Sequence, residues 1–413
     1  MVTKTDDRWV IRVYLDMNSA NADMPLILGG GVYPFNCHRD GTNWRDWVRH
    51  AGAAALADSD LEPLDIDAVI VACETDFLSL QVNPGPVVLG ELGLVGRPVV
   101  RVEGGGASGG LALREAISQI RAGFYRRVLV IGFEASGGHL NSDQLQLIYG
   151  LSFDAETDGM AGATAVSLYA LSISEYMALH GTTSRQLAHV SVKNHGNANG
   201  NPWAHKPMTL SVDEVLASPM VSSPYRRLDC SLASDGAAAV VLSHPDAAPK
   251  AGRPRTRVSG SGVGSDYARL GDRPARYEFH AKRQAAQDAY LMAGILNPSK
   301  NIQVAEVYDA FTGAELQSLE ALGLVAEGAA AAAMEDGTFD ADGPLPVNLS
   351  GGLIGQGGAP GATGIVQAVT MDRLLTGRYH RNCFADSCRR GVIDAHGGIC
   401  TIAAVHVLEQ VCQ

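Results

Sequence analysis

The sequence predicts an α/β protein in which helices cover both faces of a largely parallel sheet. Short apolar runs typical of buried strands recur at 66–72, 98–102, 127–132 and 238–242. Helical stretches alternate with such runs through residues 25–245, which favours buried parallel strands with helices packed on both sides. The 413 residues are 46% hydrophobic and 18% charged, so the chain is long and apolar enough to bury a large core.

The most informative element of the first half is a glycine turn between a strand and a helix. The strand at 98–102 is followed by Gly104-Gly105-Gly106, and helical spacing of apolar residues then runs from 111 to 121. We therefore expect a helix that begins near Ser108. A strand that turns sharply into a helix N-terminus can present a reactive side chain, and its free N–H groups can hold an oxyanion.

The second half repeats the alternation more loosely. A segment rich in proline and charge, 244–257, interrupts the pattern. After it we expect strands from Val258, at 304–308 and at 400–408, and helices at 281–293 and 314–322. The sequence therefore predicts two halves, 1–245 and 258–413.

Composition excludes several classes of function. A formal net charge of −12 disfavours nucleic acid or an anionic membrane as the main partner. No apolar run approaches the ~20 residues that a membrane-spanning helix needs, and the N-terminus lacks a signal-peptide core. The seven cysteines are irregularly spaced, as expected for reduced thiols. We expect a soluble cytoplasmic protein.

The segment 101–110, RVEGGGASGG, resembles the nucleophile turn of the thiolase superfamily, whose pattern here would be Val-Glu-x-x-Cys-x-Ser-Gly-Gly. Matched residue by residue, the cysteine falls on Gly106. Four further segments resemble the sterol-carrier-protein or lipid-transfer-protein type of thiolase: 193–202 (KNHGNANGNP), 230–238 (CSLASDGAA), 307–312 (VYDAFT) and 348–364 (NLSGGLIGQGGAPGATG). In them Tyr308 takes a His/Asn position and Gly358 a histidine position. The matches span about residues 25–410.

The resemblance implies the five-layered αβαβα thiolase fold, built from two similar halves. It also implies that residues 133–185 form a loop region that makes dimer contacts and covers the active site. Without the cysteine and the histidine, the covalent thiolase mechanism lacks its nucleophile and its base. This combination resembles the steroid side-chain aldolases of the lipid-transfer-protein group, which lack the cysteine and use a tyrosine. Those enzymes cleave a C17-hydroxylated side-chain CoA thioester to a 17-ketosteroid and propionyl-CoA, together with a small OB-fold subunit.

The resemblance therefore implies a retro-aldolase that cleaves a β-hydroxyacyl-CoA to a ketone and a short acyl-CoA such as propionyl-CoA. The substrate would be a CoA thioester, no other cofactor is expected, and a homodimer would bind an OB-fold partner to form a heterotetramer. Two alternatives stay open. One is an acyltransferase that acylates a small molecule directly or through Ser108, and the other is a non-catalytic subunit of an acyl-CoA complex.

Four residues are candidates for catalysis. Tyr308 comes first, because a phenol with a pKa of about 10 is a proton donor near neutral pH. His396 is a possible acid or base at the pocket floor. Ser108 is either a weak nucleophile or a helix cap, and Asp309 either takes part or orients its loop. Six glycines are candidates for substrate binding: Gly105, Gly106, Gly357, Gly358, Gly397 and Gly398.

A group of histidines and cysteines invites a metal hypothesis. His380, Cys383, Cys388 and His396 follow the spacing H-x2-C-x4-C-x7-H, which is not a standard zinc finger. We therefore expect no metal site.

Overall fold

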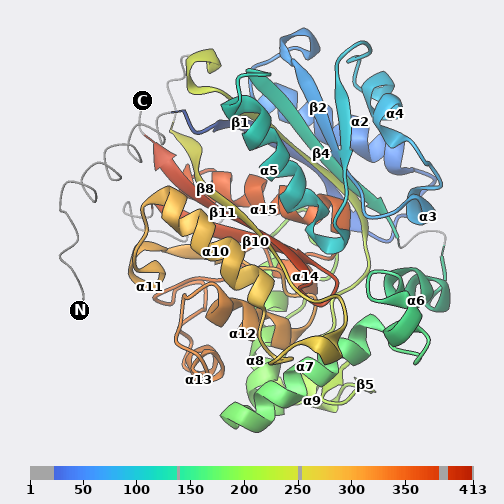
Figure 1. Ribbon diagram of the computed structural model, residues 1–413, viewed down its shortest axis with the longest axis vertical. Coiled ribbons are helices and arrows are strands. Elements are labelled where there is room, and N and C mark those ends of the chain that lie inside the picture. Colours follow the sequence, from blue (N-terminus) through green and yellow to red (C-terminus); the bar gives the residue numbers. More distant parts are fainter. Residues whose placement is uncertain (1–22, 137–139, 250–253, 381–388, 412–413) are drawn as a thin grey trace, which may run out of the picture.

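The computed structural model describes residues 23–136, 140–249, 254–380 and 389–411. Its main strands form one nine-stranded sheet in the order β3-β2-β4-β7-β1-β8-β11-β10-β9 (Figure 1). At the junction, β1 and β8 pair through only two residues each, Leu26 with Arg257 and Ile27 with Thr256. Because this ladder is so short, the sheet divides into two half-sheets, one from each half of the chain.

The strands have the following bounds. The N-terminal half-sheet contains β1 (Leu26–Asn36), β2 (Ala68–Ala72), β3 (Val99–Val102), β4 (Arg127–Ala135) and β7 (Asp235–Ser243). The C-terminal half-sheet contains β8 (Arg255–Ser265), β9 (Val304–Glu306), β10 (Arg390–Gly397) and β11 (Ile402–Val411). A separate small ribbon pairs β5 (Met220–Ser222) with β6 (Tyr225–Arg226). All the strands predicted from apolar runs are present.

The expectation of a largely parallel sheet is wrong. Only the pairs β2–β3, β2–β4 and β9–β10 are parallel. The pairs β1–β7, β4–β7, β1–β8, β8–β11 and β10–β11 are antiparallel. Uniformly apolar runs mislead here because β4 and β7 are covered by helices on both faces. A strand that is buried on both sides loses the alternation of polar and apolar residues whatever its direction.

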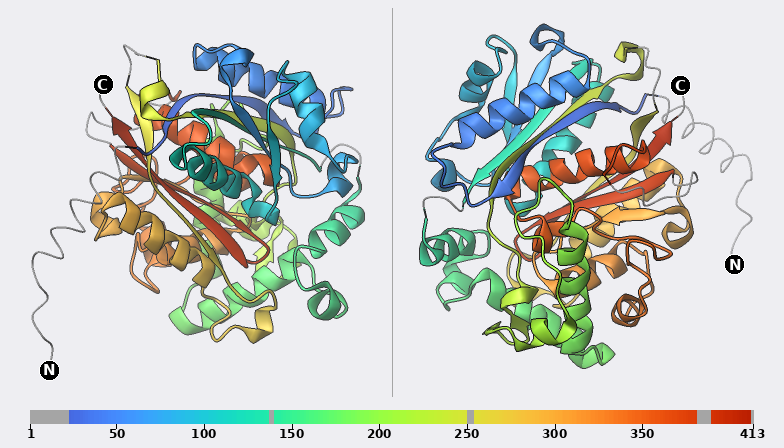
Figure 2. Two further views of the ribbon diagram at one scale, coloured as in Figure 1. Left: turned by 45° about the horizontal axis from the view of Figure 1, so that its top comes forward. Right: turned by 180° about the vertical axis from the view of Figure 1, so that it is seen from behind.

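Helices and half-sheets alternate in five layers. The outer N-terminal layer contains α2 (Trp44–Asp58) and α4 (Pro84–Glu91), and the outer C-terminal layer contains α10 (His280–Ala293) and α12 (Thr312–Ala321). Two central helices, α5 (Ser108–Arg121) and α15 (Pro360–Leu375), contact each other and strands of both half-sheets. Figure 2 shows them between the two half-sheets. This is the five-layered architecture that the resemblance implies.

Glycines allow the two central helices to meet at their N-termini. A β-carbon on Gly109 would lie 2.9 Å from the main-chain nitrogen of Gly364 and 3.0 Å from the carbonyl oxygen of Gly361. The backbones of α5 and α15 therefore touch where any side chain would separate them. Because α5 and α15 begin at this contact, the glycine turn at 104–106 and the glycine-rich loop before α15 are brought to one site.

The remaining helices form a cap and several connections. The cap region contains α6 (Ser142–Gly150), the π-helical turn Ala155–Gly159, α7 (Ala165–His180), α8 (Ser184–Ala198) and α9 (Val212–Ala217). In Figure 1, α6 lies at the right and α7, α8 and α9 lie in the lower part. Short helices are α3 (Asp76–Ser79), α11 (Pro298–Asn301), α13 (Ala330–Glu335) and α14 (Gly352–Gly355). Single 3-10 turns occur at Pro63–Asp65, Gly105–Ala107, Arg227–Asp229, Pro245–Ala247 and Leu270–Asp272.

The division into halves has a clear structural counterpart. The last strand of the N-terminal half-sheet ends at Ser243, and the first strand of the C-terminal half-sheet begins at Arg255. The predicted bounds 1–245 and 258–413 stay a prediction, because residues 1–22 and 412–413 lie outside the described part of the chain.

Candidate active site

The glycine turn after β3 is held by the hydroxyl of Ser108. Its Oγ accepts a hydrogen bond from the main-chain nitrogen of Gly104 (3.0 Å) and donates one to the carbonyl oxygen of Gly105 (2.6 Å). The side chain is fully buried and does not line a cavity. Ser108 therefore closes the turn, and its proton is already committed to a backbone carbonyl.

Tyr308 fills the space next to Gly106. A β-carbon placed on Gly106 would overlap the Tyr308 hydroxyl and the carbonyl oxygen of His396. Tyr308 follows β9, and its main-chain nitrogen donates to Asp394 Oδ1 (3.2 Å), which fixes the backbone at this point. The phenol thus stands where the side chain of a nucleophile at position 106 would begin.

The environment of Tyr308 keeps its phenol protonated. Burial raises the pKa of Tyr308 well above its ordinary value, and the negative charges of Glu74 and Asp309 raise it further. The side chain of Tyr308 lines a cavity. Tyr308 is therefore placed to donate a proton to a bound molecule.

His396 lies near the end of β10, and its ring packs against that of Tyr308 with centroids 4.6 Å apart. Its Nε2 is 2.7 Å from the Tyr169 hydroxyl, which donates to the carbonyl oxygen of Gly398 (2.8 Å). Burial lowers the pKa of His396 to about 4, assisted by the positive charge of Lys282. The imidazole is neutral near pH 7, and one of its two nitrogens is already occupied.

Behind the imidazole lies a buried ion pair. Lys282 Nζ is 2.5 Å from Asp394 Oδ2, and both side chains are fully buried. The same carboxylate oxygen lies 3.9 Å from His396 Nδ1. Asp394 thus connects Lys282 and His396 and also binds the backbone of Tyr308. The Asp394 carboxylate therefore holds the two aromatic side chains of the site in place.

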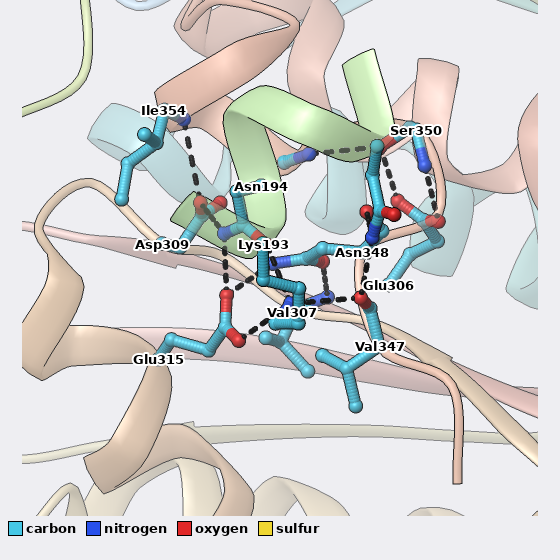
Figure 3. A network of polar contacts seen from close by, with 12 residues as sticks. Lys193, Asn194, Glu306, Val307, Asp309, Glu315, Val347, Asn348, Ser350 and Ile354 are labelled. Atoms are coloured by element: carbon cyan, nitrogen blue, oxygen red, sulfur yellow. Dashed lines mark hydrogen bonds and ion pairs between the residues drawn. The ribbon is translucent and has the colours of Figure 1, made fainter. Parts of the chain in front are cut away.

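Asp309 belongs to a buried polar network (Figure 3) and does not line the inner cavity described below. Its carboxylate accepts hydrogen bonds from Asn194 Nδ2 (2.7 Å) and from the main-chain nitrogen of Leu353 (2.6 Å). Burial raises its pKa well above the ordinary value, and the charge of Glu315 adds to the effect. Because it binds the backbone of α14, Asp309 orients the loop that carries Tyr308.

The Lys-Asn segment predicted at 193–202 supplies the centre of this network. Lys193 Nζ lies 2.9 Å from Glu315 Oε1 and donates to the carbonyl oxygen of Val347 (2.9 Å). Asn348 Nδ2 donates to Glu315 Oε2 (2.7 Å), and Asn348 Oδ1 accepts from the nitrogen of Val307 (2.7 Å). These contacts connect α8 to the loop after β9, which carries Tyr308, and to the loop before α14. The segment is therefore part of the scaffold of the site.

The six predicted substrate-binding glycines separate into four groups. Gly106 and Gly358 line the inner cavity, Gly105 and Gly397 line a neighbouring outer cavity, and Gly398 lines both. Gly357 lines neither of these cavities and packs against Ser234 and His205, with a φ of 108° that favours glycine. The structure thus brings five of the six glycines to the cavities.

The inner cavity has a volume of about 310 Å³. Tyr308, His396 and Tyr169 line it together with the apolar side chains of Leu145, Phe153, Val166, Leu232, Phe311 and Leu353. Three of these apolar residues belong to the segment 142–169, so part of the predicted cap region lines this cavity. Its predicted dimer contacts stay a prediction. The chamber suits a bulky apolar group next to a few polar atoms.

An outer cavity of about 360 Å³ adjoins the inner one, and Glu74, Ser152 and Gly398 line both. Sequence reasoning missed Glu74, although an acidic residue two positions after the apolar run at 66–72 was a usable signal. It also missed Tyr169 and Tyr149, which line the inner cavity from the cap. Nothing in the sequence connects those tyrosines to residues more than a hundred positions away.

The carboxyl group of Glu74 has an unusual environment. Burial raises its pKa to about 7, against the effect of a hydrogen bond from Ser152. Glu134, at the end of β4, accepts hydrogen bonds from the nitrogens of Glu74 (2.8 Å) and Gly361 (3.1 Å). Burial also raises the pKa of Glu134 well above its ordinary value, and the charge of Glu74 adds to this. Two carboxyl groups with displaced pKa values thus lie at the carboxyl ends of neighbouring parallel strands.

The histidine and cysteine group considered for a metal cannot be assessed as a whole. Cys383 and Cys388 lie outside the described residues. Among the residues that the structure does describe, no group of three or more His, Cys, Asp and Glu side chains is arranged to hold a metal ion.

Comparison with known families covers both halves. The thiolase N-terminal domain family matches residues 32–246, and the thiolase C-terminal domain-like family matches residues 262–410. This chain belongs to the thiolase superfamily. Within it, the chain is of the sterol-carrier-protein type, since sterol carrier protein 2 of Rattus norvegicus is 30% identical over 379 residues, 87% of this chain and 68% of that protein.

Two further relatives of this thiolase-superfamily protein bear on its activity. An acetyl-CoA acetyltransferase of Methanothermobacter thermautotrophicus is 37% identical over 369 residues, 89% of this chain and 95% of the relative. The solved structure of an Ltp2-ChsH2(DUF35) aldolase superposes with a TM-score of 0.78 at 25% identity, covering 94% of this chain and 97% of the other. The relatives thus include an acyl-transfer enzyme and an aldolase.

No helix within the described residues is long and apolar enough to cross a membrane.

Proposed function

We propose that this thiolase-fold protein is a retro-aldolase that cleaves a β-hydroxyacyl-CoA to a ketone and a short acyl-CoA such as propionyl-CoA. The observation that carries the proposal is the replacement of a side chain at position 106 by the phenol of Tyr308. Acyl transfer through a thiolate needs a nucleophile at that point, whereas cleavage of a β-hydroxyacyl thioester needs only proton transfers and a stabilised enolate. The aldolase of similar structure supports this choice.

In the proposed reaction the β-hydroxyl loses its proton, the Cα–Cβ bond breaks, and the electron pair moves into the thioester as an enolate. Gly106 and Gly398 both line the inner cavity, and we propose that their main-chain N–H groups hold the enolate oxygen. Tyr308 then protonates the α-carbon. Its raised pKa keeps the proton on the phenol until the strongly basic enolate forms.

The cavity supports the choice of a substrate class. Its apolar walls and the absence of a side chain at Gly358 favour a tertiary carbinol carbon attached to a ring system. We therefore propose a steroid-like side chain as the acyl group. We also propose a homodimer that binds a small OB-fold partner, as the aldolase relative forms a complex named with a second component.

The direct test is to incubate the protein, with an OB-fold partner of that kind, with a C17-hydroxylated steroid side-chain CoA thioester. Chromatography with mass spectrometry should detect the 17-ketosteroid and propionyl-CoA in equal amounts. Tyr308→Phe should lower turnover about 10²–10⁴-fold and leave thioester binding unchanged. Absence of cleavage for several β-hydroxyacyl thioesters with the partner present would overturn the proposal.

The acetyltransferase relative, at 37% identity, favours a second candidate function. In that case label from a radioactive acyl-CoA should move to a small acceptor or stay on the protein. An acyl group bonded to any side chain during turnover would favour this function over the aldolase. If Tyr308→Phe instead leaves the activity of the assembled complex unchanged, the chain is a non-catalytic subunit.

A further inference from the structure

The proposed cleavage needs a base for the β-hydroxyl proton, and neither Tyr308 nor His396 suits this role. Tyr308 carries its proton, and His396 has one nitrogen on Tyr169 and the other facing Asp394. Asp309 binds the backbone of α14, and Ser108 is buried in its turn. Among the described residues that line the inner cavity, Glu74 carries the only carboxyl group.

The position of Glu74 is fixed, but one of its oxygens is unoccupied. Its main-chain nitrogen donates to Glu134 Oε2 (2.8 Å), which anchors the residue just after β2. Ser152 Oγ, in the cap, donates to Glu74 Oε1 (3.0 Å). The second oxygen, Oε2, is shielded from solvent and has no hydrogen-bond partner. A buried carboxylate oxygen without a hydrogen bond is costly, so this carboxyl group, whose residue lines both cavities, favours a proton or a further donor.

We infer that Glu74 is the catalytic base of the proposed cleavage and that its carboxylate accepts the proton of the substrate's β-hydroxyl. The inference rests on the proposed function. As the O–H bond breaks, the hydroxyl oxygen becomes the ketone oxygen, the Cα–Cβ bond breaks, and Tyr308 supplies a proton to Cα. Glu74 ends protonated and Tyr308 ends as phenolate. A proton returned from Glu74 to Tyr308, directly or through water, restores the starting state without any other reactant.

The assignment also explains the place of Glu74 between the two cavities. Glu74 and Gly105, the residue before Gly106, are close, since a β-carbon on Gly105 would lie 3.6 Å from Glu74 Oε1. The charge of Glu74 acts on Tyr308, so the proposed base and the proposed acid lie within electrostatic reach of each other. They come from different half-sheets, Glu74 from the end of β2 and Tyr308 from the end of β9.

The ionisable groups that face Glu74 define its titration. Glu134 lies on β4, Glu103 follows β3, Tyr149 comes from α6 and Tyr308 from the loop after β9. Arg101, paired with Asp76, is the nearby cation that acts on Glu134. Burial raises the pKa of Glu74 to about 7, so its carboxylate is available as a base from neutral pH upward.

The test uses the assembled complex and the steroid side-chain thioester, with kcat/KM measured as a function of pH. For the wild type, kcat/KM should fall as pH decreases below about 7, because the Glu74 carboxylate becomes protonated. Glu74→Gln keeps the size of the side chain. The Glu74→Gln variant should have a kcat about 10²–10⁴-fold lower and an unchanged substrate affinity. It should also lose the fall of kcat/KM below about pH 7, which is the acid limb of the pH profile. Glu74→Asp, which keeps a carboxylate at a shorter reach, should restore part of the rate together with an acid limb.

Variants of two residues near Glu74 provide matched controls, because they should move the acid limb of the pH profile in opposite directions. Ser152→Ala removes the hydrogen bond that lowers the Glu74 pKa, so the acid limb should move to higher pH. Glu103→Gln removes a negative charge that raises that pKa, so the limb should move to lower pH. A purely structural role of Glu74 would produce neither displacement.

The outcomes separate this inference from the proposed function. If the wild-type complex cleaves the thioester and Glu74→Gln retains its rate and its acid limb, Glu74 is not the base and the retro-aldolase assignment stands. If the folded wild-type complex cleaves no β-hydroxyacyl thioester, the proposed function fails, and the role of Glu74 fails with it. Circular dichroism melting of each variant verifies that the comparison is made on folded protein.

Discussion

The side chain of Tyr308 occupies the space that a side chain at Gly106 would need. The two residues belong to different half-sheets, since Gly106 lies between β3 and α5 and Tyr308 follows β9. The missing side chain at Gly106 and the large side chain of Tyr308 therefore depend on each other. A substitution at either residue should change the packing of the other.

Gly106→Cys should therefore destabilise the protein without restoring a thiolase nucleophile. The new β-carbon would overlap the Tyr308 hydroxyl and the carbonyl oxygen of His396, and overpacking of this kind costs about 1–3 kcal/mol. Denaturant unfolding measures the loss in the free energy of unfolding. Radiolabelled acyl-CoA should leave no label on the cysteine.

The matched control is the double variant Gly106→Cys with Tyr308→Asn, in which no phenol occupies the space beside residue 106. Because the two residues are in contact, the effects on stability should be non-additive by about 0.5–3 kcal/mol. Equal and additive effects would mean that the two side chains do not compete for one space.

Ser108→Ala should lower the free energy of unfolding. Neither the wild type nor the variant should acquire a covalent acyl group from acyl-CoA. The Ser108 side chain is fully buried, and its Oγ joins Gly104 and Gly105 through two hydrogen bonds. Its loss should cost about 1–3 kcal/mol, since buried groups are left without partners.

Ser118, on the exposed face of the same helix, gives the control, because its hydroxyl bonds only to the Arg114 carbonyl of its own turn. Ser118→Ala should change stability by within about 0.5 kcal/mol. An acyl group found on Ser108 by intact-mass measurement would contradict its structural role.

Much of the fold could be predicted from the sequence, because the elements leave local patterns. The strand, glycine turn and helix around Ser108 follow from apolar runs and spacing, and the five layers follow from the family resemblance. Strand direction could not be predicted in the same way. β4 and β7 are apolar on both faces, and such runs look alike in parallel and antiparallel pairs.

The candidate site could be predicted only in part. Tyr308 and Gly106 were each visible as departures from a family pattern, but their contact depends on how the half-sheets are stacked. Tyr169 reaches His396 from the cap, a contact between segments with no pattern in common. Asp309 was visible as a motif residue, yet its direction, into the network around Glu315, is decided by tertiary packing.

Lys193→Met should destabilise the protein strongly and displace the Tyr308 loop. Lys193 is the cation that faces Glu315 in a network where both side chains are almost fully buried. Its removal leaves Glu315 and Asp309 as neighbouring buried acids, and breaking a buried pair in this way costs about 3–5 kcal/mol. Chemical denaturation measures the loss. Adding Glu315→Gln removes the uncompensated charge and should recover part of it, while an equal or greater loss in the double variant would contradict the pairing.

His406→Gln should make the protein less sensitive to acid. His406 is buried on β11, and its Nε2 lies 2.9 Å from the carbonyl oxygen of Gly110 on α5. Burial lowers the pKa of His406 to about 4, so the folded state holds the neutral ring. The unfolded chain binds a proton at a pKa near 6.5. The histidine's contribution to stability is therefore present above about pH 6.5 and is lost as pH falls toward 4.

Linkage gives the size of this effect. Between pH 7 and pH 4 the wild type should lose about 3 kcal/mol of unfolding free energy relative to the variant, from this residue alone. The comparison must be a difference between the two proteins, because acids such as Glu306, whose pKa burial raises to about 7, change stability in the opposite direction over the same range. Urea unfolding of both proteins at several pH values measures it. A wild-type minus variant difference that stays constant from pH 7 to pH 4 would show that His406 is not held neutral by the contact between β11 and α5.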